Sequence, residues 1–197
     1  MPDTANSSVI KNLLIKITME KRASVWSANL NAGIILGLLG IIWSLVLWFF
    51  DQSTNQILGL AFYIVIIIGI YLGIRSYRDK YLNGFITYGQ SLGAGVIIIL
   101  YYSIITSVFT YILYKFIDPN LVEKMLAMTE EQLADRGLAE GMIEQSMQIQ
   151  KKIMTPLVLS LGNLLNGLFM GTIFSLIISL FTKREGNPLI EEIIEEE

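Results

Sequence analysis

The chain has 197 residues, of which 53% are hydrophobic and 16% are charged, whereas soluble domains carry about 25% charged residues. Its net charge of −3 argues against a basic surface for binding nucleic acid. The sequence contains no cysteine and no histidine, which excludes disulfides, thiolate nucleophiles, imidazole bases and the usual zinc ligands. The composition therefore predicts a membrane protein without a cofactor or a metal site.

Four runs of the chain contain no Asp, Glu, Lys or Arg. They cover residues 23–50, 52–74, 81–114 and 153–182 and are 28, 23, 34 and 30 residues long. An α-helix rises about 1.5 Å per residue, so about 20 apolar residues cross the hydrocarbon core of a bilayer. Each run therefore predicts one transmembrane helix. The first run is too long for the core of a cleaved signal sequence, and we expect the mature protein to retain it.

Local signals refine where two of these helices begin. Thr87 and Gln90 have the spacing of a capping box, which predicts that the third span starts near Tyr88. Thr155 directly before Pro156 predicts the start of the fourth span. We therefore expect the four spans at about residues 26–50, 53–74, 88–114 and 156–182.

The basic residues beside the spans predict the orientation. Four Lys or Arg precede the first span, three lie in the second connection, two lie in the C-terminal tail, and the first connection has none. The third connection has five, but its seven acidic residues outnumber them. Because cytoplasmic flanks are enriched in positive charge, both termini are expected in the cytoplasm. The acidic tail at residues 183–197 is then cytoplasmic.

The connection at residues 115–152 is expected outside the bilayer on the extracytoplasmic side. Asp118-Pro119 predicts a helix start, and Thr129 and Gln132 repeat the capping-box spacing. Apolar and acidic positions alternate at helical spacing, so two or three short amphipathic helices are expected. The predicted fold is an all-α integral membrane protein, a single domain over residues 1–197. Its four-transmembrane-helix bundle carries a short amphipathic helical cap between spans three and four.

Each span contains one pair of glycines four residues apart. Glycine at this spacing lets helix backbones approach closely in a membrane, where the hydrophobic effect does not drive helices together. The pairs predict a compact bundle, and some of them are alternatively expected to serve a homo-oligomer. They are Gly33 and Gly37, Gly69 and Gly73, Gly89 and Gly93, and Gly167 and Gly171.

Polar side chains in the third and fourth spans are candidates for a solute or lipid site. The main ones are Gln90, Asn163 and Asn166. The alternative is that they form interhelical hydrogen bonds, worth about 0.6–2 kcal/mol each, that hold the bundle together. No ionisable residue lies inside a span, and ion-coupled pathways ordinarily need one. This absence favours the packing role.

A second candidate lipid site lies in the second connection, where Arg75, Arg78 and Lys80 follow the second span. Their positive charge suits a lipid phosphate, but the preference of basic residues for cytoplasmic flanks explains them equally. The sequence has no Gly-rich phosphate loop, no paired carboxylates within the spans and no Ser–His pair. We therefore expect that the protein is not an enzyme.

The order of these motifs resembles a bacterial membrane-protein family known as domain of unknown function number 4199. The residues that carry the resemblance are Gly73–Lys80, Gly84–Gln90, Phe116–Pro119 and Thr155-Pro156. The resemblance implies a four-span inner-membrane protein of Gram-negative bacteria with no catalytic residues to transfer. It also suggests a lipid-linked sugar transferase as a partner.

Two functions follow from these expectations. The first is a non-enzymatic accessory or scaffold subunit that packs with another membrane component through its glycine faces or its cap. The alternative is transport or handling of a small molecule or lipid by the polar faces of the third and fourth spans. The expected partners are the lipid bilayer and either a membrane protein or a second copy of the chain, with no nucleic acid.

Overall fold

The computed structural model describes residues 24–185, and four helices there are long and apolar enough to cross a membrane. The prediction of four spans is confirmed, and the part of the chain that is described contains no β-strand apart from one isolated bridge. The predicted acidic tail beyond Glu185 lies outside the described residues. The four helices are α2 (Val25–Phe49), α3 (Gln56–Tyr81), α4 (Tyr88–Ile112) and α7 (Pro156–Thr182).

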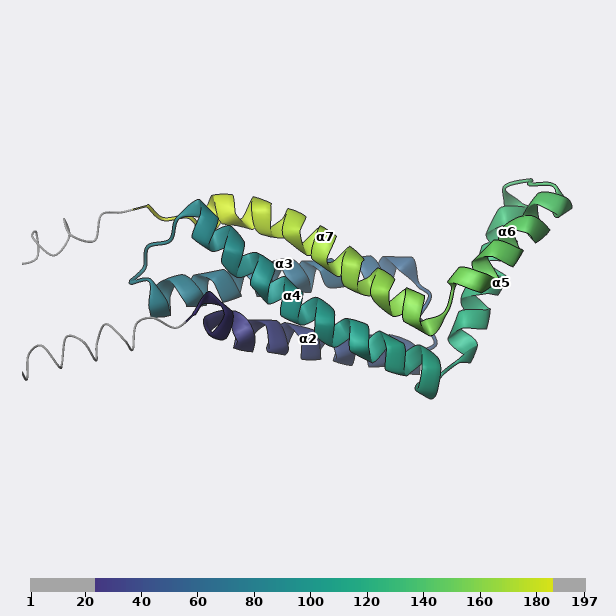
Figure 1. Ribbon diagram of the computed structural model, residues 1–197, viewed down its shortest axis with the longest axis horizontal. Coiled ribbons are helices and arrows are strands. Elements are labelled where there is room, and N and C mark those ends of the chain that lie inside the picture. Colours follow the sequence, from purple (N-terminus) through teal and green to yellow (C-terminus); the bar gives the residue numbers. More distant parts are fainter. Residues whose placement is uncertain (1–23, 186–197) are drawn as a thin grey trace, which may run out of the picture.

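Helix α4 is the centre of the bundle. It packs most extensively against α7 and next against α2, while α3 contacts all three of the other long helices. The core between them contains fully buried isoleucines, which are Ile70, Ile74, Ile98 and Ile99. Figure 1 shows the long helices side by side, with both ends of the described chain at one end of the bundle. We call that end the termini end and the opposite one the hairpin end.

The predicted helix caps are present in α4 and α7. The amide of Gln90 donates to the Thr87 hydroxyl at 3.3 Å, and the Thr87 amide donates to the Gln90 side-chain oxygen at 3.0 Å. The hydroxyl of Thr155 accepts from the Val158 amide at 3.3 Å. These bonds satisfy amide groups that have no partner within the helix. Both helices begin at the residues that the caps predicted.

Helix α3 differs from its predicted span at both ends. It begins at Gln56, because the Asn55 side chain accepts hydrogen bonds from two amides of the first turn. It continues seven residues beyond position 74 to Tyr81, because Arg and Lys are good helix formers and are favoured near the negative end of the helix dipole. Arg75, Arg78 and Lys80, which were predicted to lie in a connection, therefore belong to the last turns of α3.

Two further helices, α5 (Asn120–Asp135) and α6 (Glu140–Ile153), lie between the third and fourth long helices. They follow a short π-helical extension of α4, η1 (Leu113–Ile117). They pack against each other more than against the bundle. Figure 1 shows this helical hairpin projecting beyond the ends of the long helices. The structure therefore places a helical hairpin at the position where the sequence predicted a cap.

The helix start predicted at Thr129 is wrong. Thr129 lies inside α5, and its hydroxyl donates to the Met125 carbonyl at 2.8 Å instead of capping a new helix. The chain turns at Gly137, whose φ of 73° is a conformation that favours glycine. The hairpin therefore consists of two helices with one turn at residues 136–139.

Polar contacts link the connections to the bundle at both of its ends. At the hairpin end, the Trp48 indole donates to Asp118 at 3.0 Å and Lys124 forms an ion pair with Asp51 at 2.5 Å. At the termini end, Ile86 and Arg184 exchange two backbone hydrogen bonds of 3.0 and 2.9 Å. The loop before α4 is thereby joined to the end of α7.

Candidate site: a groove between α2 and α3

The polar faces of α4 and α7 meet each other in the interior of the bundle. The hydroxyls of Ser91 and Thr182 lie 2.6 Å apart, and the Ser107 hydroxyl donates to the Ser160 carbonyl at 2.7 Å. All four residues are buried. The hydrogen bonds therefore join α4 to α7.

Asn163 and Asn166, which the sequence marked as candidate site residues, bond to neighbouring helices. The amide of Asn163 lies 3.4 Å from the Thr106 hydroxyl and 3.3 Å from that of Thr110. The amide of Asn166 donates to the Tyr63 hydroxyl at 3.2 Å. Both line a cavity of about 160 Å³, which is smaller than the roughly 300–1,000 Å³ of typical ligand pockets. The geometry here favours packing over transport.

The other candidate site residues, Gln90, Arg75, Arg78 and Lys80, do not lie at a common site. The side chain of Gln90 closes the capping box of α4. Arg78 donates to the Asp79 carboxylate at 2.8 Å, and Arg75 lies 3.6 Å from the same carboxylate. Lys80 instead lines a groove between α2 and α3. The three basic residues therefore do not form one cluster around a ligand.

Six of the eight paired glycines lie at helix contacts. A Cβ at Gly33 would stand 2.5 Å from the Cβ of Tyr101, and one at Gly37 would stand 3.0 Å from Ile105. Gly69 and Gly73 approach Leu36 and Ile98, while Gly167 and Gly171 approach Ser103 and Ile99. The pairs of α2, α3 and α7 therefore sit where neighbouring helices come closest.

The pair in α4 is an exception, because it makes no close helix contact within the single chain, and its alternative role in a homo-oligomer stays a prediction. Nothing outside the helix lies within 4 Å of a Cβ placed at Gly89 or Gly93. The close approach is made instead by Gly95, where a Cβ would stand 2.6 Å from the Ser175 hydroxyl. Gly95 lies four residues after the buried Ser91, so the spacing of small residues was a usable signal. Within the single chain, the face of α4 that packs closely is therefore that of Ser91 and Gly95.

A groove of about 530 Å³ lies between α2 and α3. Its walls are apolar side chains that also face outward, such as Ile35, Ile68 and Leu72, whose exposed fractions are 60%, 52% and 55%. Gly69 and Gly73 line it without adding a side chain. The groove is therefore open to the outer surface of the bundle.

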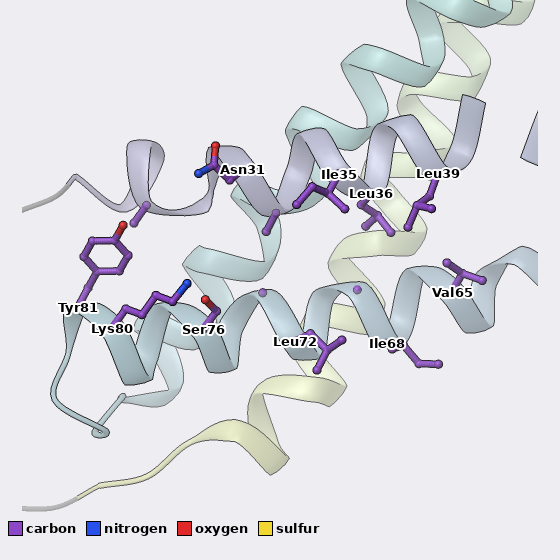
Figure 2. Close-up of a pocket in the computed structure, with 14 residues that line it drawn as sticks. Asn31, Ile35, Leu36, Leu39, Val65, Ile68, Leu72, Ser76, Lys80 and Tyr81 are labelled. Carbon is purple, nitrogen blue, oxygen red and sulfur yellow. The ribbon is translucent and has the colours of Figure 1, made fainter. Parts of the chain in front are cut away.

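Polar groups gather at the end of this groove nearest the chain termini. Figure 2 shows Ser76, Lys80 and Tyr81 on the last turns of α3 and Asn31 on α2. The Lys80 side chain extends from α3 toward the space between the two helices (Figure 2). The groove thus combines a long apolar part with a polar, cationic mouth, an arrangement that suits binding of an amphiphile.

Sequence reasoning identified Lys80 but missed Asn31, Ser76 and Tyr81 as members of the same site. Asn31 is separated from Ser76 by 45 positions, and no spacing rule connects residues on two helices whose relative placement is unknown. The charge-free run ends at Ile74, so the predicted second span did not include Ser76.

Four long apolar helices and an outward-facing groove define the class of this molecule, an all-α protein with the architecture of a multi-pass membrane protein. The chain belongs to the family described as Protein of unknown function (DUF4199), whose family model matches residues 31–184. The match confirms the resemblance seen in the motifs and includes the groove from Asn31 to Tyr81. No curated protein and no solved structure matches the chain.

Proposed function

We propose that this chain is a non-enzymatic membrane protein that handles lipid by holding one lipid molecule in the groove between α2 and α3. The observation that carries the proposal is the groove itself, with apolar walls facing the bilayer and a polar mouth at one end. Its volume of about 530 Å³ lies within the roughly 300–1,000 Å³ of small-molecule sites. Lipid handling was one of the functions expected from the sequence, but this groove is a different place from the predicted polar faces.

The length of the groove matches one leaflet of a bilayer. Its lining residues run from Val65 to Tyr81 on α3 and from Ala28 to Leu39 on α2, which corresponds to about 24 Å and about 17 Å along a helix. Half of a bilayer with its headgroups is about 20–22 Å thick. A groove of this length reaches from the middle of the membrane to one surface, as a lipid molecule does.

The walls explain how an acyl chain is retained. Leu36 is 2% exposed and forms part of the groove beside Gly69, while Ile35 and Leu72 reach outward from the two helices. An acyl chain between them makes dispersion contacts with both helices. Lipid chains outside already offer an apolar environment, so shape and the mouth must supply the preference for a bound lipid.

The test fills the groove with a bulky side chain. Leu72→Trp places an indole inside the groove, and Ile64→Trp is a matched control, because Ile64 is 63% exposed on the same helix but does not line the groove. Native mass spectrometry of protein released from membranes measures retained lipid. We expect about one lipid per chain for the native sequence and Ile64→Trp, and loss for Leu72→Trp. Equal retention in all three contradicts the proposal.

A second candidate function is that of an accessory subunit, and one observation favours it. Helix α6 lies outside the long helices and exposes a stripe of apolar side chains, Met142, Ile149 and Ile153, with exposed fractions of 59%, 56% and 53%. Their spacing of seven and four residues places them on one helix face. Such a face is suited to contact with a membrane protein partner.

Changing Met142 and Ile149 to Gln tests this second function. If α6 docks on a partner, the double variant loses a protein that co-purifies with the native chain in mild detergent. The variant Ala127→Gln changes an exposed residue of α5 and serves as the control. Unchanged co-purification, or the absence of any stoichiometric partner for the native chain, contradicts the accessory role.

A further inference from the structure

The mouth of the groove contains hydrogen-bond donors and one full positive charge. Lys80 contributes an ammonium group, Ser76 and Tyr81 contribute hydroxyls, and Asn31 contributes an amide. No Asp or Glu lines the described groove. The charge balance at this mouth is therefore positive, and its donors can satisfy the oxygens of an anion.

Lys80 differs from its basic neighbours in lacking an acidic partner. Arg75 and Arg78 share the Asp79 carboxylate, and Arg78 also reaches the Thr182 carbonyl at 3.5 Å. Within residues 24–185, Lys80 takes part in no ion pair. Both arginines thus have a carboxylate partner, whereas the Lys80 ammonium group is available to pair with a ligand.

We propose that the mouth selects a lipid whose headgroup is a phosphate with no positive charge of its own, so that the groove binds anionic phospholipids in preference to zwitterionic ones. This inference rests on the proposed lipid-holding function and adds the class of lipid. The phosphate accepts hydrogen bonds from Lys80, Ser76 and Tyr81. The acyl chain lies along the exposed groove residues Ile35, Ile68 and Leu72.

Repulsion supplies the discrimination as much as attraction does. An ethanolamine headgroup carries an ammonium group, which has no carboxylate to pair with in the described groove and lies near Lys80. A glycerol headgroup has hydroxyls instead, which the Asn31 amide and the Tyr81 hydroxyl can bond. Selectivity of this kind arises from an unfavourable contact with the wrong ligand.

The apolar walls assign the phosphate to a lipid instead of a free anion. A free phosphate ion makes no favourable contact with the apolar residues from Val65 to Leu72, which continue the groove beyond its mouth. Near a membrane surface, one Lys strengthens binding of anionic lipid by about fivefold. We therefore expect the native chain to prefer phosphatidylglycerol over phosphatidylethanolamine by about that factor.

The test uses the full-length chain in nanodiscs of phosphatidylethanolamine and phosphatidylglycerol in equal amounts, followed by native mass spectrometry of the retained lipid. Lys80→Gln removes the charge from the mouth and should reduce the preference to about one. Lys183→Gln is the matched control, because it removes the same charge at the same end of the bundle from a residue that does not line the groove. Lys80→Arg should retain most of the preference.

The outcomes separate this inference from the function on which it rests. A lipid retained by the native chain with no headgroup preference overturns the selectivity and leaves the lipid-holding function standing. Retention that is unaffected by Leu72→Trp overturns both. An equal loss of preference in Lys80→Gln and Lys183→Gln shows an effect of overall charge and overturns the assignment to the mouth. Binding of inorganic phosphate alone to lipid-free protein, abolished by Lys80→Gln, overturns the choice of a lipid ligand.

Discussion

The glycines of the four spans have identical chemistry but different surroundings. Gly33 faces the Tyr101 side chain and the Ile98 carbonyl of α4 so closely that an added Cβ must displace them, whereas nothing approaches Gly93 within 4 Å. In a tightly packed interior, an inserted side chain forces neighbours out of position. A glycine pair is therefore informative about packing only when its face of the helix is known.

Replacing Gly33 by Val should lower the free energy of unfolding by about 1–3 kcal/mol, because the valine side chain collides with α4. Gly93→Val, which makes no such collision, should change it by much less. Reversible unfolding in mixed detergent micelles, followed by circular dichroism, measures both. Equal destabilisation by the two substitutions would show that intrinsic helix preference outweighs the contact with α4.

The amide of Asn163 bonds to two threonine hydroxyls of α4. Replacing it by Leu should reduce stability by about 0.6–1.7 kcal/mol, the range of interhelical hydrogen bonds in membranes. Lipid retention should be unchanged, because this residue does not line the α2–α3 groove. Unfolding and native mass spectrometry of the same preparation give both readouts. Lost lipid with intact stability would restore the polar face of α7 as the ligand site.

At the scale of elements, helix starts could be predicted only where a cap coincided with a change in hydrophobicity. Thr87 and Thr155 each precede a long apolar run, and each caps a helix. Thr129 has the same local pattern, yet its surroundings are helical on both sides, and its hydroxyl bonds back to Met125. A short motif therefore does not distinguish a helix start from a helix interior.

Two alanine substitutions test this distinction. Thr87→Ala removes the hydroxyl that accepts the Gln90 amide and should cost about 0.5–2 kcal/mol of stability. Thr129→Ala lies in the middle of α5 and should be neutral or slightly stabilising, because alanine is the better helix former. Thermal unfolding of the two variants compares them directly. A comparable loss in Thr129→Ala would indicate that α5 is broken at that position.

The candidate site was less predictable than the spans. The charge-free runs located four helices because the thickness of a bilayer sets their minimum length. The groove depends on how far α2 and α3 separate along their lengths, and on the extension of α3 that brings Ser76 and Tyr81 beside α2. Neither property is encoded in the spacing of residues on one helix.

At the scale of the whole molecule, the two ends of the bundle differ in character. The termini end contains the groove mouth and the basic end of α3, and the hairpin end contains α5 and α6. The positive-inside rule predicts that the termini end is cytoplasmic. In that orientation the mouth of the groove lies in the cytoplasmic leaflet.

Because the chain has no native cysteine, single cysteines can report this orientation. A membrane-impermeant maleimide should label Glu144→Cys on α6 in intact spheroplasts, and should label Lys183→Cys at the end of α7 only after lysis. The same reagent added to lysed cells controls for accessibility of both sites. The reverse labelling pattern would place the groove mouth in the outer leaflet.

The most direct measurement of the central claim is an experimental structure of the full-length chain grown from a lipidic phase. Our account predicts an elongated lipid density between α2 and α3, extending from Val65 to a headgroup beside Lys80. A groove closed by direct contact of α2 with α3, or filled by a helix of a second copy, would contradict it.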